Sequence, residues 1–465
     1  MIRLPPELLA RHGGPSPRYT SYPTVAHWGA APSASQWLSW LNAALAGDDA
    51  RAGIYVHVPF CQSLCTFCGC NMRLVRNHAL AAPYVETLLK EYALYRAALS
   101  THTLTLGELH LGGGSPTYLP ASVLDRLLDG LLRDARISDG ADFAIEADPR
   151  NTTREQLAVL RRHGFNRISI GVQDFDARVL EIVNRMQAEE DVRALVDAAR
   201  TLGFGNISFD LIYGLPLQTL DSLATTFDVV ARLRPERIAF LPYAHVPWIK
   251  PSQRRYNEAD LPDTAQRHAL FLLGRERLGA MGYVEIGIDQ YALPADPLVA
   301  ALAADRLSRN FMGFSASHTD ALIGLGVSAI GDARAAYAQN EKNLQQYETR
   351  LAAGELPLQR GHVLSEEDAQ IRAVLWTLLA GAPVQLDGAQ RASAWWAEVQ
   401  PRLESLAEDA LLQLSADRIA VTETGRAFLR QIGLAFDRYL PPQRLGSIES
   451  LAPPARAASQ NFTRA

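Results

Sequence analysis

The sequence predicts an α/β fold: an open (β/α)6 parallel partial barrel with an N-terminal arm and a small C-terminal winged-helix-like α+β domain. From Gly53 onward, short apolar runs alternate with longer amphipathic segments, which is typical of parallel strands joined by helices. Six strands are too few to close an eight-stranded barrel, so we expect a curved open sheet. The expected strands span residues 54–58, 108–111, 143–146, 167–172, 207–213 and 237–243, and the expected helices span 84–99, 121–132, 154–163, 189–202 and 220–233.

The sequence changes character after residue 360. Helical stretches at 366–379 and 402–407 precede two short strands within 411–422 and a helix from Glu423, an order that resembles a winged helix. Such folds often bind DNA through a basic face, but residues 366–440 contain eleven acidic residues, seven arginines and no lysine. We therefore expect a lid or packing module. The predicted units are an arm (1–50), a catalytic barrel with a substrate-side extension (51–360), the lid domain (361–440) and a tail (441–465).

The composition favours a soluble enzyme. The chain has 465 residues, 48% of them apolar and 20% charged, which is enough to bury a large core. A net charge of -5 argues against nucleic acid and anionic membranes as partners. No apolar run approaches the roughly 18 to 20 residues that span a bilayer, and no signal peptide is evident at the start. We expect a cytoplasmic monomer.

All four cysteines lie within residues 61–70, spaced C-x3-C-x2-C-x-C. Thiolates are soft ligands that select zinc, copper(I) or iron–sulfur clusters. Structural zinc usually takes two separated ligand pairs, and this chain has no second pair. The spacing instead suits three thiolates on a 4Fe–4S cluster whose fourth iron is left open, with zinc as the alternative.

Polar groups follow most of the expected strands. Because carboxyl ends of parallel strands meet at one edge of a sheet, they predict one site there. Taken singly, a glycine run can be a turn and a carboxylate can cap the next helix. Beyond the cysteines, the set comprises Gly112–Thr117, Glu146, Asp148, Gln173, Asp174, Asp210 and Tyr243–His245.

The cysteine loop resembles that of the radical S-adenosylmethionine (SAM) enzymes. Its flanks, residues 55–60 and 68–71, and the arm segment 18–24 are similar to those of the oxygen-independent coproporphyrinogen III oxidases, and the resemblance covers about residues 15–440. It implies a radical SAM oxidoreductase of haem biosynthesis that uses 5'-deoxyadenosyl radical chemistry. Its substrate would be coproporphyrinogen III, oxidatively decarboxylated to protoporphyrinogen IX. An electron donor of flavodoxin or ferredoxin type and an electron acceptor are also implied.

The resemblance assigns residues to the cofactors. The cluster ligands would be Cys61, Cys65 and Cys68, whereas Cys70 is characteristic of the family without being a ligand; Tyr55 and Cys70 are the candidate catalytic residues. One SAM molecule would be surrounded by Tyr55, Gly113, Glu146 and Ile330. A possible second would contact Phe67, Gly114, Ser115, Gln173, Arg185, Asp210 and Ala244.

Four positions depart from the family pattern: Gln290, Ser308, Met312 and Phe314 stand where His, His, Gln and Tyr are common. They leave open a related enzyme acting on haem or another tetrapyrrole. A zinc-stabilised binding protein is the remaining alternative. Because the implied substrate carries four propionates, Arg18 and Arg309 are candidates to receive them.

Overall fold

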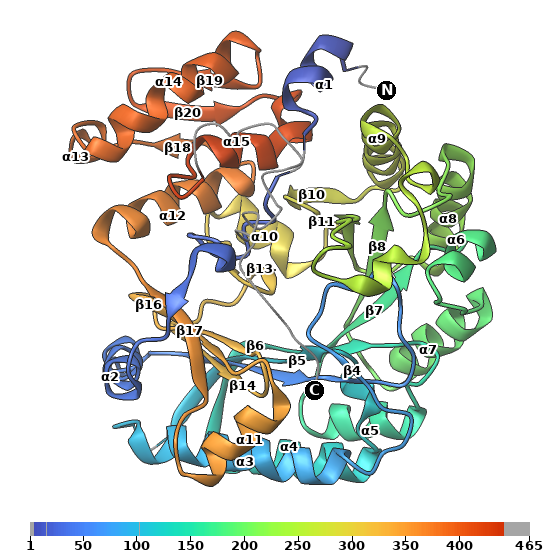
Figure 1. The fold of residues 1–465 in the computed structure, drawn as a ribbon, viewed down its shortest axis with the longest axis vertical. Helices are drawn as coiled ribbons and strands as arrows, with labels where there is room; N and C mark the ends of the chain where they lie inside the picture. Colours follow the sequence, from blue (N-terminus) through green and yellow to red (C-terminus); the bar gives the residue numbers. More distant parts are fainter. Residues whose placement is uncertain (1–3, 15, 102, 441–465) are drawn as a thin grey trace, which may run out of the picture.

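The computed structural model describes residues 4–14, 16–101 and 103–440. Its centre is a 13-stranded sheet with the order β1-β17-β16-β15-β14-β2-β5-β6-β7-β8-β9-β11-β10. The six predicted parallel strands are confirmed as neighbours in chain order, and they curve into an arc (Figure 1). They are β2 (Ala52–Val58), β5 (Leu104–Gly113), β6 (Ala135–Ala147), β7 (Arg167–Gln173), β8 (Asn206–Tyr213) and β9 (Arg237–Pro242).

The sheet is larger than the sequence predicts. A seventh parallel strand, β14 (Ala321–Leu325), pairs with β2 so that Ile323 lies opposite Ile54. Antiparallel strands, which an alternation of parallel strands and helices does not predict, extend both edges of the sheet. They are β15 (Ile330–Asp332), β16 (Ala336–Asn340), β17 (Leu358–Val363) and β1 (Gly29–Ala30) beyond β14, and β11 (Gln290–Ala292) and β10 (Val284–Gly287) beyond β9.

Helices cover the outer side of the arc (Figure 1). In α4, Leu124, Leu127, Leu128 and Leu131 recur at helical spacing and are all buried, which fixes the face that packs on the main core. Thr153 and Thr219 cap the helices that follow them by accepting from the backbone three residues on. The covering helices are α3 (Ala81–Ala98), α4 (Ala121–Leu132), α5 (Arg154–Arg162), α6 (Ala177–Ile182), α7 (Glu189–Thr201), α8 (Leu220–Leu233), α9 (Thr264–Ala280) and α11 (Leu344–Ala352).

A second core joins the C-terminal region to the arm. The C-terminal part contains α12 (Glu366–Leu379), α13 (Gly388–Arg391), α14 (Ala394–Glu408), α15 (Leu429–Ala435) and a sheet of β18 (Val384–Gln385), β20 (Arg418–Val421) and β19 (Leu412–Leu414). Tyr19 and Tyr22 of the arm are buried in this core. Tyr19 donates to Asp437 at 3.1 Å, and Tyr22 to the Phe436 carbonyl at 3.1 Å.

Two predicted helices of this region had the wrong bounds. The stretch at 402–407 belongs to the longer α14, which contains Pro401, and the helix expected from Glu423 starts as a 3-10 turn at Gly425–Phe428 before α15. The arm itself forms α1 (Pro6–His12) and α2 (Ala34–Ala44). The predicted tail lies outside the described residues. Within the described part of the chain, no helix combines the length and apolar character needed to cross a membrane.

Two pairs of short strands and one short helix complete the surroundings of the site. Strands β3 (Phe60–Cys61) and β4 (Arg73–Leu74) enclose the cysteine loop, strands β12 (Ser308–Asn310) and β13 (Gly313–Ser315) form a hairpin, and α10 is Pro297–Ala303.

Candidate active site

A cavity of about 510 Å³ follows the inner face of the parallel strands up to their carboxyl ends. Its wall brings together the cysteine loop, the glycine run at the end of β5, the arm and the β12–β13 hairpin. All four cysteines line it, as do nine of the eleven residues that the resemblance assigns to SAM: Tyr55, Phe67, Gly113, Gly114, Ser115, Glu146, Gln173, Arg185 and Asp210.

The cysteine loop is held by neighbouring elements rather than by disulfides, since all four thiols are free. The Thr66 N–H donates to the Val183 carbonyl at 2.9 Å, and the Asn184 side chain donates to the Leu64 carbonyl at 2.7 Å. These bonds fasten the loop to the end of α6, which precedes Arg185.

The thiols lie in different electrostatic environments. The Cys65 Sγ lies 3.4 Å from a guanidinium nitrogen of Arg185 and 3.7 Å from one of Arg150. Hydrogen bonding from Cys70, aided by Lys250 and Arg185, lowers the pKa of Cys68 to about 6, whereas burial and the neighbouring thiols raise the pKa of Cys61 to about 12. Three thiols that line one cavity, with Cys65 next to two guanidinium groups, form a donor set that fits a cluster with three cysteine ligands.

The glycine run lets the backbone approach this loop closely. A Cβ on Gly114 would lie 3.0 Å from the Cys61 Sγ and 2.9 Å from the Pro59 carbonyl carbon. Gly113 has φ +121°, and a Cβ there would lie 2.9 Å from the His57 ring. A positive φ at Gly113 and the close approach of neighbouring atoms at Gly113 and Gly114 both require a residue without a Cβ atom. The glycine run is therefore more than a turn.

Glu146 presents a carboxylate to the cavity. It accepts from the Gly113 N–H at 3.1 Å and lies 3.4 Å from the His110 Nε2. Burial opposes ionisation, but these two partners prevail and lower the pKa of Glu146. With 43% of its side-chain surface accessible, the ionised group can still accept from a ligand's hydroxyls.

Tyr55 and Asp210 are held on either side of Glu146. The Tyr55 hydroxyl lies 3.1 Å from Nδ1 of His57. The other ring nitrogen of His57, Nε2, lies 2.9 Å from the Asn71 carbonyl oxygen. The Tyr55 ring meets Phe311 edge-on at 4.7 Å. Asp210 accepts from Ser169 at 3.1 Å, and burial together with Glu146 raises its pKa to about 6.

Arg185 and Gln173 are buried beside the cysteine loop. Arg185 donates to the Gly171 carbonyl and lies 3.6 Å from Asp148, in addition to its contact with Cys65. Gln173 has φ +70°, an uncommon conformation for a residue with a side chain, at an irregularity in the β7–β8 pairing.

Two predicted SAM contacts, Ala244 and Ile330, lie outside the cavity lining. Ala244 is exposed, and its carbonyl accepts from Gln253, which also donates to the Phe67 carbonyl at 3.2 Å. Ile330 opens β15, where it pairs with Gln339.

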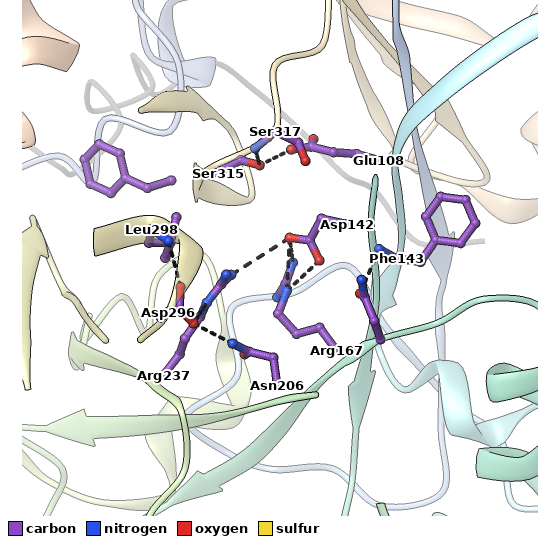
Figure 2. A network of polar contacts seen from close by, with 12 residues as sticks. Glu108, Asp142, Phe143, Arg167, Asn206, Arg237, Asp296, Leu298, Ser315 and Ser317 are labelled. Atoms are coloured by element: carbon purple, nitrogen blue, oxygen red, sulfur yellow. Dashed lines mark hydrogen bonds and ion pairs between the residues drawn. The ribbon is translucent and has the colours of Figure 1, made fainter. Parts of the chain in front are cut away.

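A charged network that was not predicted from the sequence also lines the cavity (Figure 2). Arg167 forms a bidentate ion pair with Asp142 at 3.0 Å, and Arg237 pairs with Asp296 at 2.7 Å. The sequence contains one sign of this network, because several of the expected strands include a charged residue. A buried strand tolerates such a residue only when its charge is paired.

The positions that depart from the family pattern take different roles. Gln290 accepts from the Phe314 N–H at 3.0 Å, and Ser308 donates to the Ser315 carbonyl at 3.2 Å, so both stabilise the β12–β13 hairpin. Met312 and Phe314 line the cavity, as does Gln290, and contribute apolar groups to its wall.

A parallel partial barrel with three cysteines of the C-x3-C-x2-C motif at the carboxyl end of its first strand defines a radical SAM protein, and residues 55–230 match the Radical SAM superfamily. The oxygen-independent coproporphyrinogen III oxidase of Pseudomonas aeruginosa is 40% identical over 95% of this chain and 97% of its own, and that of Escherichia coli is 38% identical over 93% and 95%. The solved structure of the E. coli coproporphyrinogen III oxidase, described as a radical SAM enzyme, superposes with a TM-score of 0.85 at 36% identity, covering 91% of this chain and 98% of its own.

The chain therefore belongs to the family of oxygen-independent coproporphyrinogen III oxidases. It is a radical SAM oxidoreductase, and its cofactors are a 4Fe–4S cluster and SAM.

Proposed function

We propose that this chain catalyses the oxygen-independent oxidative decarboxylation of coproporphyrinogen III to protoporphyrinogen IX. The observation that carries the proposal is the cavity itself, in which the cysteine loop and Glu146 share one enclosure with an arginine-bearing hairpin. The near full-length similarity to oxidases of that name supports the same substrate.

In this proposal each cofactor has its own residues. Cys61, Cys65 and Cys68 hold the cluster. The bound cluster and SAM supply the radical that removes a hydrogen atom from the β-carbon of a propionate. Loss of CO2 and of one electron to an acceptor then leaves a vinyl group, and a second propionate follows.

The chain's own side chains position the reactants. The Gly112–Gly114 backbone leaves room for the amino-acid end of SAM, and Glu146 accepts from its ribose hydroxyls. Tyr55 packs against this region, and Cys70 stays outside the ligand set. A second SAM molecule would use Phe67, Gly114, Ser115, Gln173, Arg185 and Asp210. None of these groups needs to act as a strong base, because the cofactors supply the radical chemistry. The cavity positions the reactants and excludes water.

The remaining assignments are part of the same proposal. Residues 361–440 act as a lid rather than as a DNA-binding domain, and the arm closes against them through Tyr19 and Tyr22. The enzyme works as a cytoplasmic monomer, without nucleic acid or membrane, and a flavodoxin- or ferredoxin-type protein supplies the electron.

The test is anaerobic turnover of the reconstituted protein with reductant, SAM and coproporphyrinogen III, followed by mass spectrometry of the porphyrin products. We expect stepwise loss of two CO2 with formation of 5'-deoxyadenosine, and neither with Cys68→Ser. Formation of 5'-deoxyadenosine without decarboxylation would contradict the substrate. In that case, haem or another tetrapyrrole would be tested as the substrate, because Met312 and Phe314 make part of the cavity wall apolar.

A further inference from the structure

Six arginines line the described cavity, and four of them are already paired with carboxylates. Arg150 lies 2.6 Å from Asp148, and Arg185 lies 3.6 Å from the same carboxylate. In the network of Figure 2, Arg167 is bound by Asp142 and Arg237 by Asp296. The other two are Arg18 and Arg309.

Arg309, on the β12–β13 hairpin, has no carboxylate within 4.0 Å among the described residues. The Arg309 Nη2 donates to the Tyr19 carbonyl at 3.3 Å, and its buried Nε has no partner in the described part of the chain. The guanidinium lies over the Phe314 ring at 4.5 Å from the centroid. Asp289 attracts it but is bound by Arg430.

Arg18 comes from the arm, is exposed, and lines the same cavity as Arg309, where its charge acts on both Arg309 and Asp210. Among the described residues it has neither an ion pair nor a side-chain hydrogen bond. It directly precedes Tyr19, whose carbonyl accepts from Arg309. Burial of Arg309 lowers its pKa to about 9, and the positive charge of Arg18 acts in the same direction.

We propose that Arg18 and Arg309 together form a receptor for a carboxylate of the substrate. An isolated cation in a largely buried position is costly unless a ligand neutralises it, and a guanidinium matches a carboxylate with two parallel hydrogen bonds. Phe314 supports one face of the Arg309 guanidinium, which leaves its edge for such a ligand. This inference rests on the proposed function, whose substrate carries four propionates.

The receptor has a rigid support. Asn310 donates to Glu108 at 3.0 Å, and Ser315 donates to the other oxygen of the same carboxyl group. These bonds fasten both strands of the hairpin to β5, on the sheet that also carries the cysteine loop. A carboxylate held by Arg309 therefore fixes the tetrapyrrole relative to the loop, while Arg18 couples the same carboxylate to the arm.

Binding of two stable probes to the reconstituted protein tests the receptor: coproporphyrin III, with four free carboxylates, and its tetramethyl ester. We expect Arg309→Gln to weaken coproporphyrin III binding at least about 30-fold, the lower end for truncating one member of a buried charge pair. Because Arg18 is exposed, Arg18→Gln should weaken binding by a smaller factor, up to about fivefold. The ester should bind all variants alike. Arg309→Lys should restore part of the affinity.

Thermal unfolding without ligand separates this role from a structural one. Removing an unpaired buried charge should raise the midpoint in Arg309→Gln, whereas loss of a structural residue would lower it. Arg178→Gln is the matched control, because Arg178 is exposed on α6 and outside the cavity lining. It should change neither quantity.

Two outcomes overturn the receptor alone: unchanged coproporphyrin III binding in both arginine variants, or equal loss of both probes. In either case, decarboxylation by the unsubstituted protein would leave the proposed function standing. If the unsubstituted protein neither binds coproporphyrin III nor decarboxylates coproporphyrinogen III, the proposed function fails and the receptor fails with it.

Discussion

Replacement of Gly114 by alanine would test whether the glycine run shapes the cysteine loop. The added Cβ would lie 2.9 Å from the Pro59 carbonyl carbon, 3.0 Å from the Phe60 carbonyl oxygen and 3.0 Å from the Cys61 Sγ. Two of these atoms belong to the backbone, so a rotamer change cannot relieve the clash. The loop would have to move, and the Cys61 thiol would move with it.

The expected magnitude follows from these contacts. Overpacking by one methyl group typically costs about 1–3 kcal/mol. If that cost falls on the cluster-bound arrangement, cluster affinity should decrease about 5- to 150-fold, since about 1.4 kcal/mol corresponds to a factor of ten. The Tyr19–Asp437 contact and the rest of the second core are remote in the fold and should be unaffected.

Iron and sulfide analysis after anaerobic reconstitution measures the effect, with circular dichroism as the check of folding. Gly279→Ala is the matched control, because Gly279 is exposed on α9 and a Cβ there meets nothing within 4 Å. Full cluster content in Gly114→Ala at limiting iron would refute the argument that this glycine keeps the loop in place.

Three further predictions concern the loop, the hairpin and the arm. Cys70→Ser should retain iron and sulfide whereas Cys68→Ser should not, and equal loss in the two would make Cys70 a ligand. Burial raises the pKa of Glu108 to about 7, so the stability it contributes is present below its ordinary pKa of 4.5 and is lost as pH rises through 7. Urea titrations should show Glu108→Gln gaining up to about 3 kcal/mol over the unsubstituted protein between pH 5 and 8, and a constant difference would contradict the shift. Tyr19→Phe should lower the unfolding free energy by about 1–3 kcal/mol because it deprives buried Asp437 of a donor, and an unchanged urea midpoint would show that this bond is not needed.

The parallel strands could be predicted because their signals are local. Strand β8 has apolar residues at five of its eight positions, and α4 repeats leucine at helical spacing. Strand β14 was missed because Gly324 interrupts its apolar residues and Gly326 follows it, and because its partner β2 lies more than 260 residues earlier in the chain. Pairing between strands that are so far apart in the chain produces no periodic pattern in the sequence.

The site divides in the same way. The spacing of the cysteines and the glycine run could be recognised because each is a short, continuous sequence pattern. The free state of Arg309 is not, because it depends on Asp289 being bound by Arg430, 141 residues away. The charged network likewise requires pairs, such as Arg237 with Asp296, that only the folded sheet brings together.

The most direct test of the proposed chemistry is the fate of a propionate hydrogen. Coproporphyrinogen III deuterated at the β-carbons of its propionates would be turned over anaerobically, and the 5'-deoxyadenosine formed would be analysed by mass spectrometry. The account predicts that deuterium appears in 5'-deoxyadenosine in step with vinyl formation. Vinyl products accompanied by unlabelled 5'-deoxyadenosine would contradict it.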